Sequence, residues 1–415
     1  MTANTPNTNN NSVMANGTSA LASKLRDSKR YYWFIVTYIV LLSAFGSFVN
    51  NMYSPALPAM CRYFGCNIPT VQTGLTTGMV GLAIGQLILG PLSDRYGRRP
   101  MLLASLIVFI IGALVSIFSP TIHFFIVCRF FQGLGASGGY FLARTIPADV
   151  YTDRGLAKLM ALTGAINGIA PASAPVVGGV AADAFGWKGV FVILTLFALF
   201  IMGMAPFLKE SLSTDRRTIG KWWKAFGGYK SLLKNRPFII HISLKGSALG
   251  ILFAYISSAP FVLQEQYGLS QTNYGLIIGA NSLFVAVGSM LSLKFKSMKS
   301  ATTVGTSILT IGTIAQALAL WRIHSIYVFE ICMALILFGL GLIFTTTNTL
   351  AMDEGRQNTG EASALLGVAG YIFGAIASPM VGLGTVNHAT AITILVLSAI
   401  TISLALTAKR LPIKH

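Results

Sequence analysis

Long apolar stretches, separated by short polar segments, recur along the whole chain. The mean hydropathy is +0.68 and only 10% of the residues are charged, whereas about a quarter are charged in a typical soluble domain. A bilayer core of about 30 Å needs about 20 apolar residues per helix. The sequence therefore predicts an all-α membrane protein with twelve transmembrane helices, near residues 33–51, 70–92, 101–118, 123–146, 159–182, 188–208, 237–263, 273–293, 301–320, 325–350, 359–382 and 388–408.

The basic residues are distributed unevenly between the predicted loops. The net charge is +18, and 25 of the 30 Lys and Arg residues fall on one side of the predicted spans. Cytoplasmic loops of membrane proteins carry such an excess. This pattern predicts that both termini are cytoplasmic. It also explains the basicity as a topology signal, so we expect no nucleic-acid partner.

A basic polar segment divides the spans into two groups of six. We predict a disordered cytoplasmic tail (1–30), an N-terminal bundle (31–208), a basic cytoplasmic linker (209–236), a C-terminal bundle (237–408) and a second cytoplasmic tail (409–415). The loop G-P-L-S-D-R-Y-G-R-R after the second span has a degenerate counterpart, G-S-M-L-S-L-K-F-K, that begins at Gly288. These features indicate two pseudo-symmetric bundles, an arrangement in which transporters hold substrate near the midplane.

Several chemistries are not indicated by the sequence. A G-x-G-x-x-G pattern at 133–138 lies within a hydrophobic span and follows no strand, so we interpret it as close helix packing. No P-loop, HExxH or CxxC pattern occurs, and we expect no enzyme activity, cofactor or metal site. Cys61 and Cys66 share the first external loop, where either a disulfide or two free thiols are compatible with the spacing.

The loop after the second span places one acid among three arginines. Its carboxylate can accept hydrogen bonds from the arginines and from a helix N-terminus, whose dipole favours a negative partner. Such a lock would stabilise one conformation of a two-state element; the alternative is a topological anchor. The gating residues we predict are Gly90, Asp94, Arg95, Gly97, Arg98 and Arg99.

Three motifs together resemble the major facilitator superfamily. They are the loop just described, R-F-F-Q-G-L-G from Arg129, and the Pro- and Gly-rich stretch at 168–179. Further stretches at 52–60, 253–270 and 362–367 resemble the bicyclomycin/chloramphenicol-resistance (Bcr/CflA) branch of drug:proton antiporters. The resemblance implies the major facilitator fold and the export of drug-like small molecules by alternating access with proton antiport. We expect a monomer in the bacterial inner membrane whose partners are a small-molecule substrate, protons and the lipid bilayer.

The stretch at 168–179 looks like the antiporter signature of that family. Its prolines each remove a backbone hydrogen bond, which membrane helices tolerate where neighbours satisfy the freed carbonyls, and its glycines permit close approach. We expect a bent helix packed on the eighth span, which forms either a leak-resistant seam or an ordinary proline kink; the two do not exclude each other. The residues are Gly168, Pro171, Pro175, Gly178 and Gly179.

Proton coupling needs a titrating group. Relatives in this branch usually carry an acid in the first span, where this chain has Asn50 and Asn51. Arg129 lies within the fourth span, where a charge is expensive and usually functional; the resemblance implies a coupling role, and the alternative is an anchor that extends to the interface. Glu330 is the acid clearly within a span, and it either titrates or is solvated by an open vestibule. Asp149 is a third candidate.

Lys245 lies about 12 Å into the seventh span by helical rise. It either extends to the cytoplasmic face or adds positive charge to the central cavity. The second case would favour an anionic metabolite, such as a carboxylate siderophore, as an alternative cargo. A transport-dead sensor or scaffold is a further alternative, which rests on the missing acid. The cargo contacts we predict are Asn50, Asn51, Tyr53, Tyr140, Lys245, Phe253 and Tyr255, although core packing also explains each aromatic residue.

Overall fold

The computed structural model describes residues 29–151, 153–213, 217, 227–323, 325–356 and 359–410. Within these ranges the regular secondary structure is helical. Almost all of the predicted N-terminal tail, part of the linker and most of the predicted C-terminal tail lie outside the described residues.

The first half of the chain forms five long helices and one short one. They are α2 (Lys29–Asn51), α3 (Leu57–Phe64), α4 (Ile68–Tyr96), α5 (Arg98–Ile117), α6 (Ile122–Val150) and α7 (Asp153–Met204). The 52-residue α7 contains both the fifth and the sixth predicted span. Gly186 separates them, with φ of +68° and ψ of −179°, a backbone conformation that glycine adopts without steric cost.

The second half contains six long helices preceded by one short helix. They are α8 (Gly227–Leu232), α9 (Arg236–Pro260), α10 (Gln271–Ser292), α11 (Met298–Leu318), α12 (Ile326–Glu354), α13 (Thr359–Met380) and α14 (Val386–Lys409). In the described residues, ten helical segments are long and apolar enough to cross a membrane. The addition of α6 and the division of α7 at Gly186 give the twelve predicted spans.

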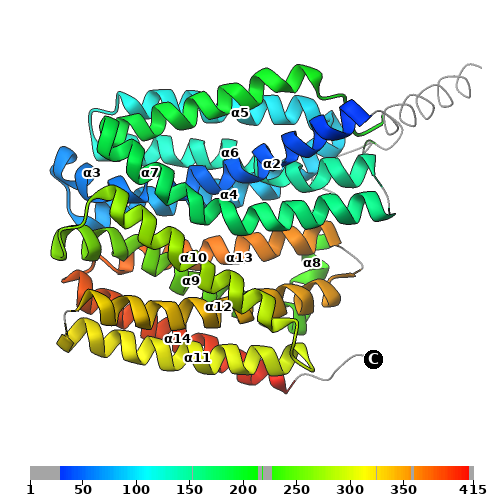
Figure 1. The fold of residues 1–415 in the computed structure, drawn as a ribbon. Coiled ribbons are helices and arrows are strands. Elements are labelled where there is room, and N and C mark those ends of the chain that lie inside the picture. The colour runs from blue at the N-terminus through cyan, green and yellow to red at the C-terminus, as the bar shows by residue number, and fades with distance from the viewer. Residues whose placement is uncertain are drawn as a thin grey trace, which may run out of the picture.

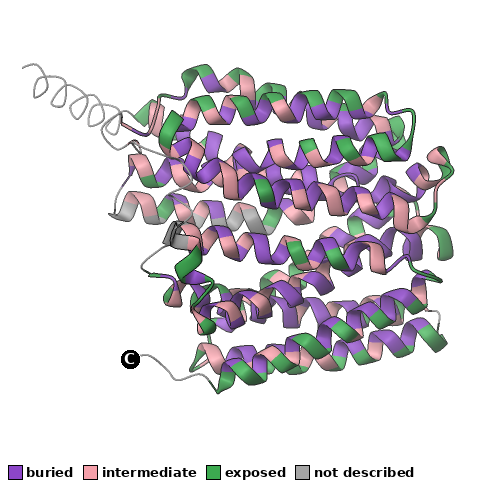
Figure 2. Cartoon of the chain, turned by 180° about the vertical axis from the view of Figure 1, so that it is seen from behind, coloured by how far each residue is buried: buried purple, intermediate pink, exposed green. Residues whose placement is uncertain are grey.

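The two halves form two bundles that lie side by side (Figure 1). Contacts between the bundles run mainly through α4 with α13 and through α7 with α10. We call the end of the molecule that carries α8 and Arg410 the linker side, and the opposite end the far side. Figure 2 shows exposed residues on the outermost helices and buried residues through the middle, as expected for helices that pack on one another and face lipid outward.

Glycines let α4, α5 and α6 approach closely. A Cβ atom at Gly81 would overlap the carbonyl oxygen of Phe130, and one at Gly133 would overlap that of Gly78. A Cβ at Gly135 would meet the backbone of Phe109. The G-x-G-x-x-G pattern at 133–138 therefore serves helix packing, as predicted.

A glycine seam joins the two bundles between α7 and α10. A Cβ at Gly179 would overlap the carbonyl oxygen of Gln271, and one at Gly275 would overlap that of Pro175. The backbone of α7 stays helical through Pro171 and Pro175 and departs from helical angles at Gly186. The expected packing of the fifth span on the eighth is thus present.

We expect Gly179→Ala to destabilise the protein, because the new methyl group would meet backbone rather than a flexible side chain. Overpacking of this kind typically costs about 1–3 kcal/mol. Gly203→Ala is the matched control, since Gly203 lies on the same helix and a Cβ there would meet nothing within 4 Å. The measurement is the melting temperature in detergent. Equal melting of the Gly179→Ala and wild-type proteins would contradict the seam.

Candidate functional site

Arg98 ties together three helices on the linker side. Its guanidinium lies 2.6 Å from Asp94 Oδ1 at the end of α4 and donates to Asp149 Oδ2 at the end of α6, at 2.8 Å. It also donates to Ser93 Oγ at 2.6 Å. Although Arg98 begins α5, it is only 5% exposed. The predicted loop acid is thus paired with one of the three predicted arginines, and Asp149 joins the same network.

Glu210 caps the start of α5. Its carboxylate accepts the backbone N–H of Arg98 at 2.8 Å and that of Arg99 at 3.2 Å, where the helix dipole favours a negative charge. Gly97 has φ of +100°, and a Cβ there would press on this carboxylate. Because the cap is supplied from 112 residues along the chain, sequence reasoning missed it.

The remaining predicted loop residues differ in exposure, and Arg99 is half-buried. Gly90 is buried and Arg95 is exposed, and the Arg95 guanidinium sits 5.3 Å from the centroid of the Tyr96 ring. The short helix α8 lies nearby, packed on α13. Burial, together with the negative charges of Glu361 and Asp94, raises the pKa of Tyr229 in α8 to about 12. The Asp94 carboxylate of the first bundle is therefore within electrostatic range of α8, which packs on the second bundle.

Arg129 is completely buried inside the first bundle. It donates to Gln132 Oε1 at 2.6 Å and to the Val49 carbonyl at 3.2 Å, and its guanidinium carbon lies 4.1 Å from the Tyr53 ring centroid. Among the described residues no carboxylate forms an ion pair with it. The side chain stays in the bundle core, so the anchor interpretation is wrong.

The asparagines that replace the usual acid of the first span are buried and directly follow Val49, whose carbonyl accepts a hydrogen bond from Arg129. Asn50 and Asn51 are 6% and 7% exposed, and Asn51 donates to the Ser47 carbonyl at 3.0 Å. Since Val49 contacts Arg129, this end of α2 supplies the arginine with a backbone carbonyl. A neutral amide cannot exchange a proton near neutral pH, so these residues offer no titrating group.

Glu330 lies in a polar cluster inside the second bundle. Asn281 of α10 donates to Glu330 Oε2 at 2.6 Å and contacts the Tyr255 hydroxyl at 2.7 Å. The second carboxyl oxygen, Oε1, is buried and has no hydrogen-bond partner within the described structure. A buried polar atom without a partner is unusual and calls for an explanation. This arrangement can hold a proton on the carboxyl group.

A third polar cluster, after those around Arg129 and Glu330, lies around Tyr140, where the two bundles meet. Arg144 of α6 donates to the Tyr140 hydroxyl at 3.0 Å, and Tyr371 of α13 lies close to Tyr140. The Phe253 ring lies 6.2 Å from that of Tyr371. Lys245 of α9 lies close enough to Arg144 to feel its positive charge. Basic side chains from opposite bundles therefore lie within electrostatic range of one another, close to aromatic rings.

The residues predicted to contact cargo thus separate into three groups. Tyr53 lies with Arg129, and Asn50 and Asn51 lie nearby; Tyr255 lies with Glu330. Only three of the predicted set gather in the third cluster, namely Tyr140, Lys245 and Phe253. Sequence reasoning missed Arg144 in this cluster, because its position near a helix end made it one more basic loop residue.

The far side is closed by contacts between the bundles. Asp183 accepts the backbone N–H of Thr272 at 2.8 Å and its hydroxyl at 2.6 Å. Arg62 lies 3.4 Å from Glu265, and Gln264 donates to the Pro55 carbonyl at 2.8 Å. Cys61 and Cys66 are free thiols on this side, and Cys61 Sγ donates to the Cys66 carbonyl at 2.7 Å.

The known proteins that this chain resembles are membrane transporters. A family model, the Major Facilitator Superfamily, matches residues 39–379. The chain is 35% identical to YdgK of Bacillus subtilis, described as an uncharacterized MFS-type transporter, over 85% of this chain and 88% of that protein. It is 27% identical to the chloramphenicol resistance protein CraA of Acinetobacter baumannii, over 76% and 77%. It is 25% identical to multidrug resistance protein D of Escherichia coli, over 79% and 83%.

Solved structures show the same fold. A bacterial homologue of the lysosomal transporter Spinster, in an inward-facing occupied conformation, superposes with a TM-score of 0.74 at 15% identity and covers 92% of this chain and 98% of that one. The xylose transporter XylE from E. coli gives 0.71 at 14%, with the same coverage. The predicted fold of twelve helices is confirmed. The chain belongs to the major facilitator superfamily of multi-pass membrane transporters.

Proposed function

We propose that this protein exports drug-like small molecules in exchange for protons. The relatives named for chloramphenicol and multidrug resistance support the cargo class. The observation that carries the coupling is the Glu330 carboxyl, which lies inside a bundle with one oxygen bonded to Asn281 and the other without a partner. Intramembrane acids of this kind mark proton pathways in transporters.

The linker side is the cytoplasmic side in this proposal. The 25 basic residues assigned to one side support it, since cytoplasmic loops are enriched in Lys and Arg. The protein then lies in a bacterial inner membrane as a monomer with both termini in the cytoplasm. The bundles, joined at the far side, would bind cargo from the cytoplasm and must break those contacts to release it outside.

The coupling follows from the position of the charges. Proton binding at Glu330 removes the one negative charge of its cluster, while Arg129 keeps its positive charge in the other bundle. The two protonation states therefore present different charges to a cargo held between the bundles. The network of Arg98, Asp94 and Asp149 is a candidate two-state contact on the linker side, because Asp94 lies within electrostatic range of Tyr229 in α8, which packs on the second bundle.

The test is transport in proteoliposomes with an imposed pH gradient, with radiolabelled chloramphenicol as the probe. Export coupled to protons predicts accumulation of the probe in the acidic compartment that collapses when a protonophore is added. Accumulation would exclude the scaffold alternative. No gradient-dependent movement of chloramphenicol or of other neutral and cationic drugs would contradict the proposal.

A second candidate is an exporter of anionic metabolites, and the pair of cations in the third cluster favours it. Lys245 and Arg144 come from opposite bundles, and neither forms an ion pair within the described residues. An anionic group between them would offset their repulsion. Arg144 and Lys245 give this contact between the bundles a basic character, whereas Arg129 and Glu330 lie inside the first and the second bundle.

Lys245→Ala separates the two candidates. We expect transport of an anionic probe such as citrate to fall at least about tenfold, because the lost charge–charge attraction exceeds about 1.4 kcal/mol. Lys245→Arg should retain most of the anion transport, and chloramphenicol transport should change by less than about twofold. Full-rate movement of both cargoes by Lys245→Ala would exclude the anionic candidate.

A further inference from the structure

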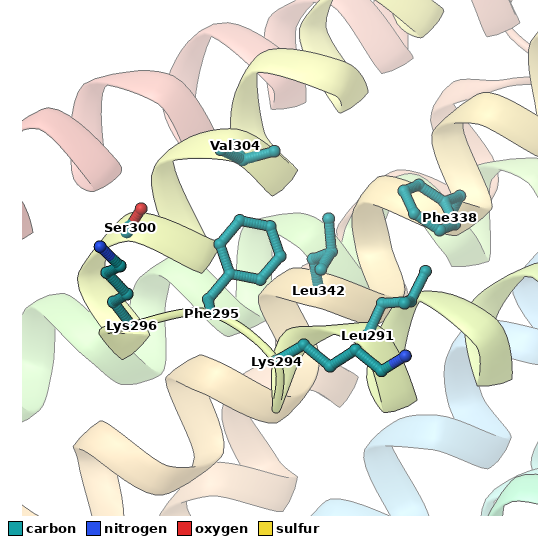
Figure 3. Close-up of a pocket in the computed structure, with 8 residues that line it drawn as sticks. All are labelled: Leu291, Lys294, Phe295, Lys296, Ser300, Val304, Phe338 and Leu342. Carbon is teal, nitrogen blue, oxygen red and sulfur yellow. The ribbon is translucent and has the colours of Figure 1, made fainter.

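A groove of about 560 Å³ opens on the second bundle at its linker side. Its walls come from the end of α10, the following turn, and the facing parts of α11 and α12 (Figure 3). It lies apart from the three polar clusters described above. The residues that line it are Leu291, Lys294, Phe295, Lys296, Ser300, Val304, Phe338 and Leu342.

The walls and surroundings of this groove are apolar. Leu342 is buried at its floor, and Val304 is 37% exposed at its edge. Large apolar side chains continue outward along α10 and the turn, with Met290 72% and Leu293 68% exposed. A soluble protein rarely exposes such a patch, so this surface faces lipid, and the groove is open to the bilayer.

Two lysines stand at the mouth of the groove. Lys294 and Lys296 are exposed, and Figure 3 shows them on either side of Phe295, with their ammonium groups at separate edges of the groove. In the part of the chain that the structure describes, neither forms a hydrogen bond or an ion pair. Their position at a helix end places them at the level of lipid headgroups.

The loop at the pseudo-symmetric position in the first bundle has acidic partners that the loop after α10 lacks within its own sequence. There, Arg98 is paired with Asp94 and Asp149, and Glu210 caps the next helix. The counterpart after α10 reads S-L-K-F-K and contains no acid. In the first bundle, acidic side chains of the protein therefore offset the charge of the basic loop. In the second bundle, the corresponding loop sequence contains only basic charges.

We propose that this groove binds an anionic phospholipid. The phosphate would lie between Lys294 and Lys296, and an acyl chain would follow Leu291, Phe338 and Leu342 into the groove. Basic pockets between membrane helices on the cytoplasmic side recognise such headgroups. The site goes beyond the proposed function, although the leaflet it faces rests on the proposed orientation. The lipid supplies the negative charge that Asp94 supplies in the first bundle.

The experiment measures lipid binding by quenching of a fluorophore attached at Leu293→Cys, in protein whose four cysteines are replaced by serine. The quenchers are brominated phosphatidylglycerol and brominated phosphatidylcholine in mixed micelles. Protein with both lysines should prefer phosphatidylglycerol. Lys294→Gln/Lys296→Gln should reduce that preference about 25-fold, because each lysine near an anionic surface contributes about 1 kcal/mol, or about fivefold.

Two controls make the outcome decisive. Lys230→Gln/Lys234→Gln removes two exposed lysines from the α8 region and should leave the preference unchanged. Val304→Trp fills the groove and should weaken the binding of both lipids. Soluble glycerol phosphate should not compete with lipid binding. An equal preference in the Lys294/Lys296 variant and the unsubstituted protein, or an equal loss in the α8 control, would overturn the proposal. Melting temperatures and chloramphenicol transport establish that each variant is folded.

Discussion

Glu330→Gln is expected to abolish the accumulation of cargo driven by a pH gradient while leaving cargo exchange intact. Glutamine preserves the shape of the side chain and can still bond to Asn281, but it cannot carry a proton. A gradient of one pH unit can support up to about tenfold accumulation for one proton exchanged. We therefore expect about tenfold accumulation in the wild type and a ratio near one in the variant, measured in proteoliposomes.

The matched control is Glu265→Gln, which removes an exposed acid from the far side. Glu265 pairs with Arg62 across the bundles at 3.4 Å, and its side chain is 39% exposed, so the substitution should cost less than about 1 kcal/mol. Counterflow of labelled cargo without a pH gradient shows that Glu330→Gln still binds and moves it. Full gradient-driven accumulation by Glu330→Gln would remove Glu330 from the coupling mechanism.

Arg98→Ala is expected to be the most destabilising single substitution in the linker-side network. It would remove the guanidinium that donates to Asp149, whose side chain is only 12% exposed. The loss of one partner of a buried ion pair typically costs about 3–5 kcal/mol. We expect a much lower melting temperature and loss of transport. Arg95→Ala, at an exposed position of the same loop, should change stability by less than about 1 kcal/mol.

A second substitution tests the cause of this loss. If the loss of this ion pair at a buried carboxylate is responsible, Arg98→Ala/Asp149→Asn should recover part of the stability, because the second substitution removes the Asp149 charge. The double variant should still transport poorly, since the contact is absent. Equal melting temperatures for Arg98→Ala and Arg95→Ala would show that the network does not hold α4, α5 and α6 together.

Local sequence features predicted the helices, the close packing and the loop. Apolar stretches indicate the positions of the spans directly, because the thickness of the bilayer fixes the length of a transmembrane helix. The glycine pattern at 133–138 predicts close packing, and the structure shows overlap for Cβ atoms at Gly133 and Gly135. The boundary between the fifth and sixth spans also fell close to Gly186. These features depend on neighbours in the chain, so a single sequence contains them.

Contacts between distant segments could not be predicted in this way. Glu210 reaches the start of α5 from beyond α7, and Arg144 meets Lys245 only because α6 and α9 pack across the bundles. The predicted cargo residues lie in three separate places because side chains on neighbouring helical turns point into different parts of a bundle. This direction also depends on how the helices pack. An acid within a span is rare, so the sequence alone points to Glu330, but its hydrogen bond with Asn281 follows only from the fold.

The most direct test of alternating access is to lock the far side shut. Asp183→Cys/Thr272→Cys, in protein whose four native cysteines are replaced by serine, places two thiols at the contact that joins α7 and α10. We predict that oxidation stops the export of chloramphenicol in proteoliposomes and that reduction restores it. Undiminished export with the disulfide formed would contradict the account, because cargo would then leave without separation of the bundles at that end.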